Sequence, residues 1–215
     1  EDYFLKELKE DGSYKYDGFG YDRGHLAPSA DFRWSEKALS ESYFYSNMTP
    51  QLPDFNREIW ADLESFLRAH VYNNPTKDLF VITAPVLTEN LPKQTRGVNN
   101  MSIPELHYKI AVDFEDEKGI AFLIPQKYND YPIESFVISI DSLETLTGIN
   151  FYPNLTENQE KKIESSTEIS AWRSGKAKND VAPISPDDLP RNCYNTMQAK
   201  QFYDYPNEVS ICGTI

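Results

Sequence analysis

The sequence predicts an α+β domain, because one clear helical pattern is followed by several strand patterns in a single chain. Between about residues 54 and 71, apolar side chains recur at the i, i+3/i+4 spacing of an amphipathic helix. Residues 79–87 then form an apolar run typical of a buried strand, and residues 106–114 and 119–125 form a hairpin pattern around an acidic turn. The 215 residues are 40% apolar and 13% aromatic, which is enough for one large domain.

Shorter elements are predicted on either side of these segments, and residues 1–20 are polar and rich in turn signals. The elements before the long helix are a strand at 21–28, a short helix at 36–43 capped by Ser35, and an aromatic strand at 43–47 stopped by Thr49-Pro50. The elements after the hairpin are a strand at 136–140 and a short helix at 143–146, which Asp141-Ser142 caps and Gly148 ends.

A change of composition near residue 154 divides the chain. Residues 156–167 are highly charged, which leaves an exposed helix or an exposed loop open. Residues 175–190 resemble a linker with three prolines, and residues 209–215 alternate in the manner of a strand. We therefore expect residues 1–153 to form the core and residues 154–215 to form a C-terminal extension, with the start of an accessory β module as one reading.

The charge of the chain counts against a polyanionic partner. The formal net charge is −13 and the isoelectric point is near 4.7, whereas nucleic-acid binders usually carry a basic patch. Net charge governs solubility and long-range steering, so a local site can still be positive. If the partner is a polyanion, we expect weak non-specific affinity, a strong need for a divalent metal and a small basic island at the site.

Targeting and redox signals are few. No run approaches the ~20 apolar residues of a membrane span, so no membrane partner is expected. Cys193 and Cys212 lack the spacing of a zinc site, and one disulfide and two separate thiols are about equally compatible with them. A disulfide would suit a secreted or periplasmic bacterial protein, which is the localisation we expect, with any targeting segment outside this chain.

The chemistry-bearing residues are concentrated between Tyr21 and Arg68. Hydrolysis of a phosphodiester needs a base for water, a cation to neutralise charge, and help for the leaving oxygen. His25 suits the base because imidazole titrates near neutrality, and Gly24 before it permits close approach of backbone or substrate. A lone histidine is more often structural than catalytic, but the residues that neighbour His25 favour the catalytic role.

Asn56 lies in the first turn of the long predicted helix, where an amide commonly caps the helix. The functional reading is that its side-chain oxygen binds Mg²⁺, which keeps most of its water ligands and needs few from the protein. The helix N-terminus would also favour a phosphate. Glu64, two turns later, is expected to act through the metal's water shell, whereas an ordinary ion pair between Glu64 and Arg68 is the plain alternative.

Three polar residues around the histidine have two readings each. Arg23 can hold a phosphate with its planar guanidinium group, or it can be a solvated strand residue. Asn47 can bond the histidine loop or the substrate, or it can end a strand at a turn. Asp22 is expected to brace the turn or pair with an arginine rather than bind metal.

Together these residues resemble the DNA/RNA non-specific endonucleases of the ββα-metal class, to which Serratia-type nucleases and mitochondrial endonuclease G belong. The resemblance covers about residues 20 to 153. It is carried in order by Asp22-Arg23-Gly24-His25, Leu26-Ala27-Pro28, Ser46-Asn47-Met48-Thr49-Pro50-Gln51, Asn56, Trp60, Leu63-Glu64 and Arg68. The segments Asp31-Phe32-Arg33-Trp34-Ser35 and Phe151-Tyr152-Pro153-Asn154 are particularly similar to endonuclease G.

The resemblance implies a mixed α/β domain with a central antiparallel sheet flanked by helices, and a ββα-metal finger that carries the site. It implies a metal-dependent, sugar-non-specific endonuclease that leaves 5′-phosphate products on DNA and RNA. Mg²⁺ is the expected cofactor, and Mn²⁺ can substitute for it. His25 matches the general base and Asn56 the sole protein metal ligand. Arg23, Asn47, Glu64 and Arg68 match family positions that support phosphate binding or the water shell of the metal.

Two departures from the family pattern leave alternatives open. The family usually carries a further arginine some thirty residues before the histidine, a position that precedes this chain, and Arg33 or Arg96 is a candidate substitute. Residues 154–215 extend past the common core. The rival functions are a binding module with the nuclease fold and reduced or lost activity, and an interaction protein whose polar residues only cap helices. A homodimer and an inhibitor protein remain open as partners.

Overall fold

The computed structural model describes residues 7–8, 14–15, 21–93, 100–127 and 130–173. Its centre is a four-stranded antiparallel sheet of order β5-β6-β7-β8, as the resemblance implies. The strands are β5 (Phe80–Pro85), β6 (Leu106–Asp113), β7 (Lys118–Pro125) and β8 (Val137–Ile138). The hairpin of β6 and β7 keeps one register throughout, from Leu106 opposite Pro125 to Asp113 opposite Lys118. The α+β class and the predicted hairpin are therefore confirmed.

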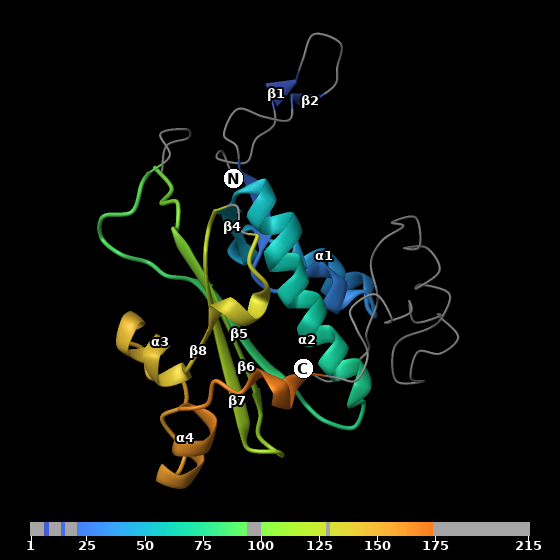
Figure 1. The fold of residues 1–215 in the computed structure, drawn as a ribbon. Helices are drawn as coiled ribbons and strands as arrows, with labels where there is room; N and C mark the ends of the chain where they lie inside the picture. The colour runs from blue at the N-terminus through green and yellow to red at the C-terminus, as the bar shows by residue number, and fades with distance from the viewer. Residues whose placement is uncertain (1–6, 9–13, 16–20, 94–99, 128–129, 174–215) are drawn as a thin grey trace.

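Helices cover both faces of this sheet, as Figure 1 shows. On one face lies α2 (Ala61–Asn73), whose apolar side chains pack on β6 and β7. On the other lie α3 (Ile140–Thr147) and α4 (Glu157–Ile163). Strand alternation sends neighbouring side chains of β6 and β7 to the two separate cores. The side chains on the α2 side are Ala111, Ile120, Phe122 and Ile124. The side chains on the side of α3 and α4 are Tyr108, Ile110, Val112 and Ala121.

A second, smaller unit carries the Asp22-Arg23-Gly24-His25 motif. Strand β3 (Asp22–His25) pairs antiparallel with β4 (Met48–Gln51), and between them lie a 3-10 turn at Ser29–Phe32, α1 (Glu36–Ser42) and a 3-10 turn at Tyr45–Asn47. A π-helical segment, Phe55–Trp60, follows β4 and leads directly into α2. The order strand, strand, helix is the ββα finger that the resemblance implies. A separate pair, β1 (Glu7–Leu8) and β2 (Tyr14–Lys15), is also antiparallel.

Two short elements differ from the sequence prediction. The aromatic segment at 43–47 is not a strand: it ends in the 3-10 turn, and the strand begins at Met48. Pro50 does not stop that strand but lies within it, opposite Arg23. A proline lacks an N–H donor, and β3 and β4 form only a two-stranded ribbon in which each strand has one free edge, so the loss is tolerated there.

Helix capping was predicted correctly at one helix and displaced at another. Ser35 caps α1, since its hydroxyl accepts from the Ala38 N–H at 3.3 Å. At α3 the cap is Ser139 rather than Asp141-Ser142, so the helix starts three residues earlier than expected. Gly148 ends α3 with a φ of 70°, as its position predicted. The charged segment at 156–167 does contain a helix, α4, closed by a capping box at Thr156 and Gln159.

Packing on the sheet continues past residue 153. Ile163 at the end of α4 is fully buried against α3 and β7, and Trp172 in the 3-10 turn Ile169–Trp172 is 1% exposed in the core beside α2. The linker-like run at 175–190, the alternating run at 209–215 and both cysteines lie outside the described residues. Within the described part of the chain, no helix has the length and apolar character needed to cross a bilayer.

Candidate active site

The four residues of β3 point alternately to opposite sides of the finger. Asp22 is 5% exposed and Gly24 is buried, whereas Arg23 is exposed and His25 is partly buried. The two inward residues face the body of the domain, and the two outward residues share the open side. The strand therefore separates the acidic residue of the motif from its arginine and histidine, although all four are consecutive in sequence.

Asp22 holds the residue predicted to bind metal. Its Oδ2 accepts a hydrogen bond from Asn56 Nδ2 at 3.0 Å. The same carboxylate accepts from Arg57 Nε and Nη2, each at 2.8 Å, in a bidentate pair. The prediction that Asp22 pairs with an arginine is confirmed. The partner is Arg57, which the sequence analysis did not single out, although it directly follows Asn56.

The bond to Asp22 uses the amide nitrogen of Asn56, so Asn56 Oδ1 is the atom that this bond leaves for a ligand. An amide oxygen is a suitable ligand for a hard divalent cation. The asparagine lies in the π-helical segment Phe55–Trp60, a rare form that occurs frequently at functional sites. The simple capping role is not observed, because residue 54 precedes the segment with helical geometry and Asn56 bonds Asp22 instead. These residues fit a single-ligand metal site.

The segment after His25 is fixed by Asn47. The Asn47 Oδ1 accepts from the Ala27 N–H at 2.9 Å, and Nδ2 donates to the Ala27 and Ser42 carbonyls, each at 2.8 Å. The main chain adds a bond from the Leu26 N–H to the Asn47 carbonyl at 2.9 Å. Of its two predicted readings, Asn47 thus bonds the histidine loop. It positions His25 from two residues away along the loop.

His25 itself packs against an aromatic ring. The ring of Tyr43 stands edge-on to the imidazole, with 4.8 Å between the ring centroids. Tyr43 is 55% exposed, and its neighbours Phe44 and Tyr45 are exposed as well. An aromatic wall on the solvent side of a histidine restricts the orientation of its ring and offers an apolar surface to a flat ligand such as a base. The sequence analysis assigned these aromatic residues to a strand and missed this contact.

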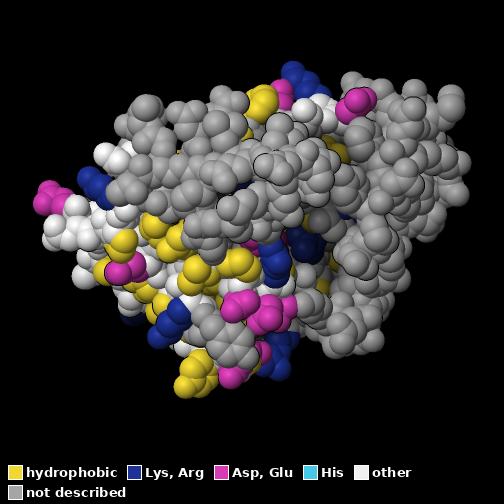
Figure 2. Space-filling view, turned by 90° about the horizontal axis from the view of Figure 1, so that it is seen from above, with side chains coloured by type: hydrophobic (Ala, Val, Ile, Leu, Met, Phe, Trp, Pro, Cys, Tyr) yellow, Lys and Arg dark blue, Asp and Glu magenta, His cyan; other side chains and the backbone are white. Residues whose placement is uncertain are grey.

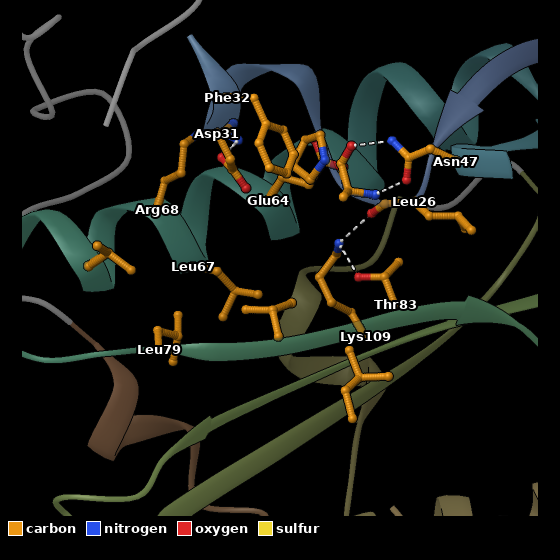
Figure 3. A pocket seen from close by; sticks show the side chains of 15 residues that line it. Leu26, Asp31, Phe32, Asn47, Glu64, Leu67, Arg68, Leu79, Thr83 and Lys109 are labelled. Carbon is orange, nitrogen blue, oxygen red and sulfur yellow. Dashed lines mark hydrogen bonds and ion pairs between the residues drawn. The ribbon is translucent and has the colours of Figure 1, made fainter. Parts of the chain in front are cut away.

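Behind the same loop lies a cavity of about 450 Å³, shown in Figure 3. Its walls come from the loop after β3, from α2 and from β5 and β6. Two predicted site residues, Glu64 and Arg68, line it, and Figure 3 shows Arg68 directed toward Asp31. The Arg68 Nη1 donates to Asp31 Oδ1 at 2.9 Å, so its ion pair is with the loop. The apolar part of the wall consists of Leu26, Ala27, Pro28, Phe32, Leu67, Val71, Leu79, Val81 and Ile82.

A buried lysine reaches into this cavity from the sheet. Lys109 on β6 is 1% exposed, and its Nζ donates to Thr83 Oγ1 at 2.8 Å and to the Leu26 carbonyl at 3.3 Å (Figure 3). Its Nζ also lies 4.8 Å from the centroid of the Trp60 ring. Burial lowers the pKa of Lys109, with Glu64 and Asp31 acting in the opposite direction. Lys109 ties the residue after His25 to the sheet, and nothing in its sequence context indicated this.

The underside of the finger rests on His107 of β6. Its Nε2 lies 3.4 Å from Thr49 Oγ1, and its ring packs against Phe55 and Trp60. Burial, followed by the charge of Lys109, lowers the pKa of His107 to about 3. His107 is therefore held neutral beneath the finger, where it packs against Phe55 and Trp60.

The predicted site residues thus fall into two groups around the Leu26–Pro28 loop. His25 and Arg23 share the open face of β3, and Asn56 is bonded to the inward side of the same strand. Glu64, Arg68 and Asn47 line the cavity behind the loop. Of the two candidate substitutes for the family's upstream arginine, Arg33 is partly buried in the structure. The other, Arg96, lies outside the described residues. On the face shown in Figure 2, the visible basic side chains lie beside acidic ones and next to an apolar patch.

Comparisons with known proteins identify this arrangement. The family model "DNA/RNA non-specific endonuclease" matches residues 1–158. Bovine mitochondrial endonuclease G is 33% identical over 156 residues, which cover 65% of this chain and 50% of that protein. A nuclease of Nostoc sp. is 33% identical over 167 residues, which cover 71% of this chain and 58% of that protein. The chain thus spans about half the length of the curated relatives it matches.

A solved structure supports the same relationship. The structure titled as the complex of EndoG with EndoGI, on the mechanism of EndoG inhibition, aligns with a TM-score of 0.58 at 29% identity. The alignment covers 69% of this chain and 66% of that chain. The finger, the antiparallel sheet and the motif residues are all within the matched family region. The chain therefore belongs to the DNA/RNA non-specific endonuclease family.

Proposed function

We propose that this chain carries the active site of a sugar-non-specific endonuclease, which hydrolyses phosphodiester bonds in DNA and RNA and leaves 5′-phosphate ends. The observation that carries the proposal is the placement of two groups on one four-residue strand. The first residue of β3 is Asp22, which holds the Asn56 amide, and the last residue is His25. A strand of this length spans about 10 Å from end to end. In this proposal the metal ion, the scissile phosphate and the attacking water lie between the two ends.

In this proposal His25 takes the proton from the attacking water. Its side chain is partly buried, with Nε2 buried, its ring is oriented by Tyr43, and the loop after it is held by Asn47 and Lys109. A positioned general base of this kind contributes about 10²- to 10⁴-fold to the rate. Arg23 shares the open face with His25 and holds a phosphate of the substrate.

Asn56 would hold Mg²⁺, or Mn²⁺ in its place, through Oδ1. A divalent cation at this position supplies charge neutralisation at the phosphate and at the departing oxygen. The bidentate pair of Asp22 with Arg57 fixes the carboxylate that orients the amide. Glu64 and Arg68 lie further along the same helix and line the cavity behind the loop, from which they act on the site through solvent and through the loop.

The net charge of −13 favours a second candidate, a nuclease-fold module that binds a partner with little or no cleavage. The EndoG relative was solved with an inhibitor protein, so an inhibitor is also a reasonable partner to propose for this chain. The intact set of Asp22, His25 and Asn56 favours the enzyme over the binding module, because cleavage needs that set and docking alone does not.

The test is nicking of supercoiled plasmid DNA in Mg²⁺, with EDTA as the blank and with His25→Ala alongside. We expect cleavage that EDTA abolishes and that His25→Ala lowers by at least about 100-fold, without a change in thermal unfolding. Asn73→Ala is a matched helix control, because its side chain bonds the Ala69 carbonyl at the far end of α2 and should leave cleavage unchanged. Cleavage at the wild-type level by folded His25→Ala would overturn the proposal, and binding without cleavage would favour the second candidate.

A further inference from the structure

Three carboxylates meet on the face of the sheet opposite α2, away from the finger. Asp141 and Glu144 lie on α3, and Glu164 directly follows α4. One oxygen from each of the three lies within 4.8 Å of the others. Figure 1 shows α3 and α4 on the other side of the sheet from α2. This cluster, here the α3–α4 carboxylate cluster, is therefore separate from the site around His25 and Asn56.

Among the described residues, the buried member of the cluster has no partner for one of its oxygens. Glu164 is 1% exposed, and its Oε1 is buried with no hydrogen-bond partner there. The hydroxyl of Tyr152 is likewise buried, with no hydrogen-bond partner in the described part of the chain. A buried, unbonded carboxylate oxygen costs far more free energy than an exposed one unless a cation or a proton compensates it.

The charged groups that act on the Glu164 carboxyl from the described part of the chain are Glu144, Glu160 and Asp141, and all of them are acidic. Their repulsion adds to the cost of burying a charged carboxylate. The concentration of like charge around a buried oxygen is typical of a site that is filled by a positive ion.

The main chain holds the cluster in place. The Asp141 N–H donates to the Glu164 carbonyl at 3.1 Å, which joins the start of α3 to the end of α4. The Phe151 N–H donates to Glu144 Oε1 at 2.7 Å and leaves Glu144 Oε2 outside that bond. Gly119 on β7 lets α4 approach closely, because a Cβ there would lie 2.4 Å from the Ile163 carbonyl oxygen. The three carboxylates are thus fixed by the backbone on either side of them.

We propose that the α3–α4 carboxylate cluster of Asp141, Glu144 and Glu164 is a binding site for Ca²⁺. Two oxygens on one ion lie at most twice the metal–oxygen distance apart, which is about 5 Å for Ca²⁺ and about 4 Å for Mg²⁺. The oxygens lie within 4.8 Å of one another, which is inside the range that one Ca²⁺ can bridge. Asp141 is exposed, so water completes the coordination shell on that side.

The bound ion would act as a structural tie rather than as part of the nuclease chemistry. It joins α3 to α4, and the buried side chains of both helices, Ile140, Leu143 and Ile163, cover one face of β6 and β7. Binding to the folded state alone raises stability in proportion to the logarithm of the ion concentration above Kd. We expect thermal stability to depend on Ca²⁺ even where no nucleic acid is present.

The experiment is thermal unfolding of the full chain in EDTA and in CaCl₂ from about 10 μM to 10 mM, a range that covers the usual affinities of such sites. We expect Tm to rise with Ca²⁺ by several degrees, and by less at equal Mg²⁺. Asp141→Asn, at an exposed position, should weaken the apparent Kd by about tenfold or more, and Glu164→Gln should abolish the rise. Glu164→Gln should be at least as stable as the wild type in EDTA, because a neutral amide replaces a buried carboxyl.

Two controls separate this site from other effects. Glu160→Gln removes a charge that acts on Glu164 without removing a ligand, so it should change the apparent Kd by less than about threefold. Asn56→Ala should keep the whole Ca²⁺-dependent rise, which shows that the ion is not at the nuclease site. A Tm that does not respond to Ca²⁺ would overturn the proposal and would mean that a proton alone satisfies Glu164. A Tm that responds equally in the wild type, Asp141→Asn and Glu164→Gln would also overturn it.

Discussion

Asp22 and Asn56 are joined by a hydrogen bond of 3.0 Å from the Asn56 Nδ2 to the Asp22 Oδ2, across 34 positions of sequence. The bond links the first strand of the finger to the first turn of its helix, and it determines which atom of the amide remains for a ligand. The carboxylate is 5% exposed and is also held by Arg57. Asp22 therefore orients the Asn56 amide, and in our proposal it does so without being a metal ligand itself.

Replacing Asp22 should weaken metal binding more than it slows the chemistry. Asp22→Ala leaves the Asn56 amide free to rotate, so we expect the Mg²⁺ concentration for half-maximal cleavage to rise by about 10- to 100-fold. Asp22→Asn keeps an acceptor oxygen and should show a smaller rise. Cleavage rates measured across a Mg²⁺ titration check this. Asp116→Ala, which removes a carboxylate paired with Lys118 far from the finger, is the control. An unchanged Mg²⁺ dependence in Asp22→Ala would show that the bond has no positioning role.

Gly24 should be intolerant of a side chain because of Gln51. A Cβ at Gly24 would lie 2.1 Å from the Gln51 Cδ and Oε1, and Gln51 is fully buried, so its side chain has little room to move. We expect Gly24→Ala to lower the free energy of unfolding by about 1–3 kcal/mol through overpacking. Chemical denaturation of Gly24→Ala, Gln51→Ala and the double variant measures the coupling. The double variant should be more stable than the sum of the single effects allows, whereas simple additivity would refute the contact.

His107 should make stability depend on pH below neutrality. Its folded pKa of about 3 lies below the ordinary value of 6.5, so between these two values the unfolded chain binds more protons than the folded one. Stability from this group is therefore complete above about pH 6.5 and falls as the pH decreases toward 3. The slope has an upper limit of about 1.4 kcal/mol per pH unit. Urea unfolding of His107→Phe between pH 4 and 7 should show a shallower slope than the wild type; equal slopes would contradict the assignment.

Lys109 should matter more for activity than for stability. Lys109→Met keeps an apolar side chain of similar length, but it removes the charge over Trp60 and the bonds to Thr83 and to the Leu26 carbonyl. Removal of a buried charge offsets part of the lost bonding, so the free energy of unfolding should change by less than about 2 kcal/mol. The looser loop after His25 should lower kcat for plasmid cleavage by about tenfold. Lys37→Met, at a side chain that is 84% exposed, is the matched control. An unaltered kcat in Lys109→Met would mean that the loop does not need this tie.

The sequence was most predictive where a pattern is local and repeated. The helical spacing at 54–71 and the hairpin at 106–125 are confirmed, because periodic burial on one face determines each of them. Ser35 and Gly148 were recognisable because caps are chosen by the chemistry of one residue. The strand at 43–47 was wrong because aromatic residues favour strands only when a sheet receives them, and here they lie exposed beside His25.

The sequence indicates which residue types to expect at the proposed site but not which contacts they make. His25 and Asn56 stand out by motif, whereas the bonds of Asp22 to Asn56 and Arg57 join distant segments and leave no periodic signal. Lys109 lies in a strand whose pattern predicts only burial, and its role depends on a carbonyl 83 positions earlier. The α3–α4 carboxylate cluster likewise requires two helices to meet. Contacts of this kind follow from tertiary packing and therefore require a structure.

The central claim is that His25 and Asn56 act together on one phosphodiester. The most direct measurement is the rate of plasmid cleavage at saturating Mg²⁺ for His25→Ala, Asn56→Ala and the double variant, each verified as folded by thermal unfolding. Groups that act as a unit are strongly non-additive. We predict that each single variant loses at least about 100-fold and that the double variant is no slower than the worse single variant. Wild-type cleavage by either folded single variant, or fully additive losses in the double variant, would contradict the account.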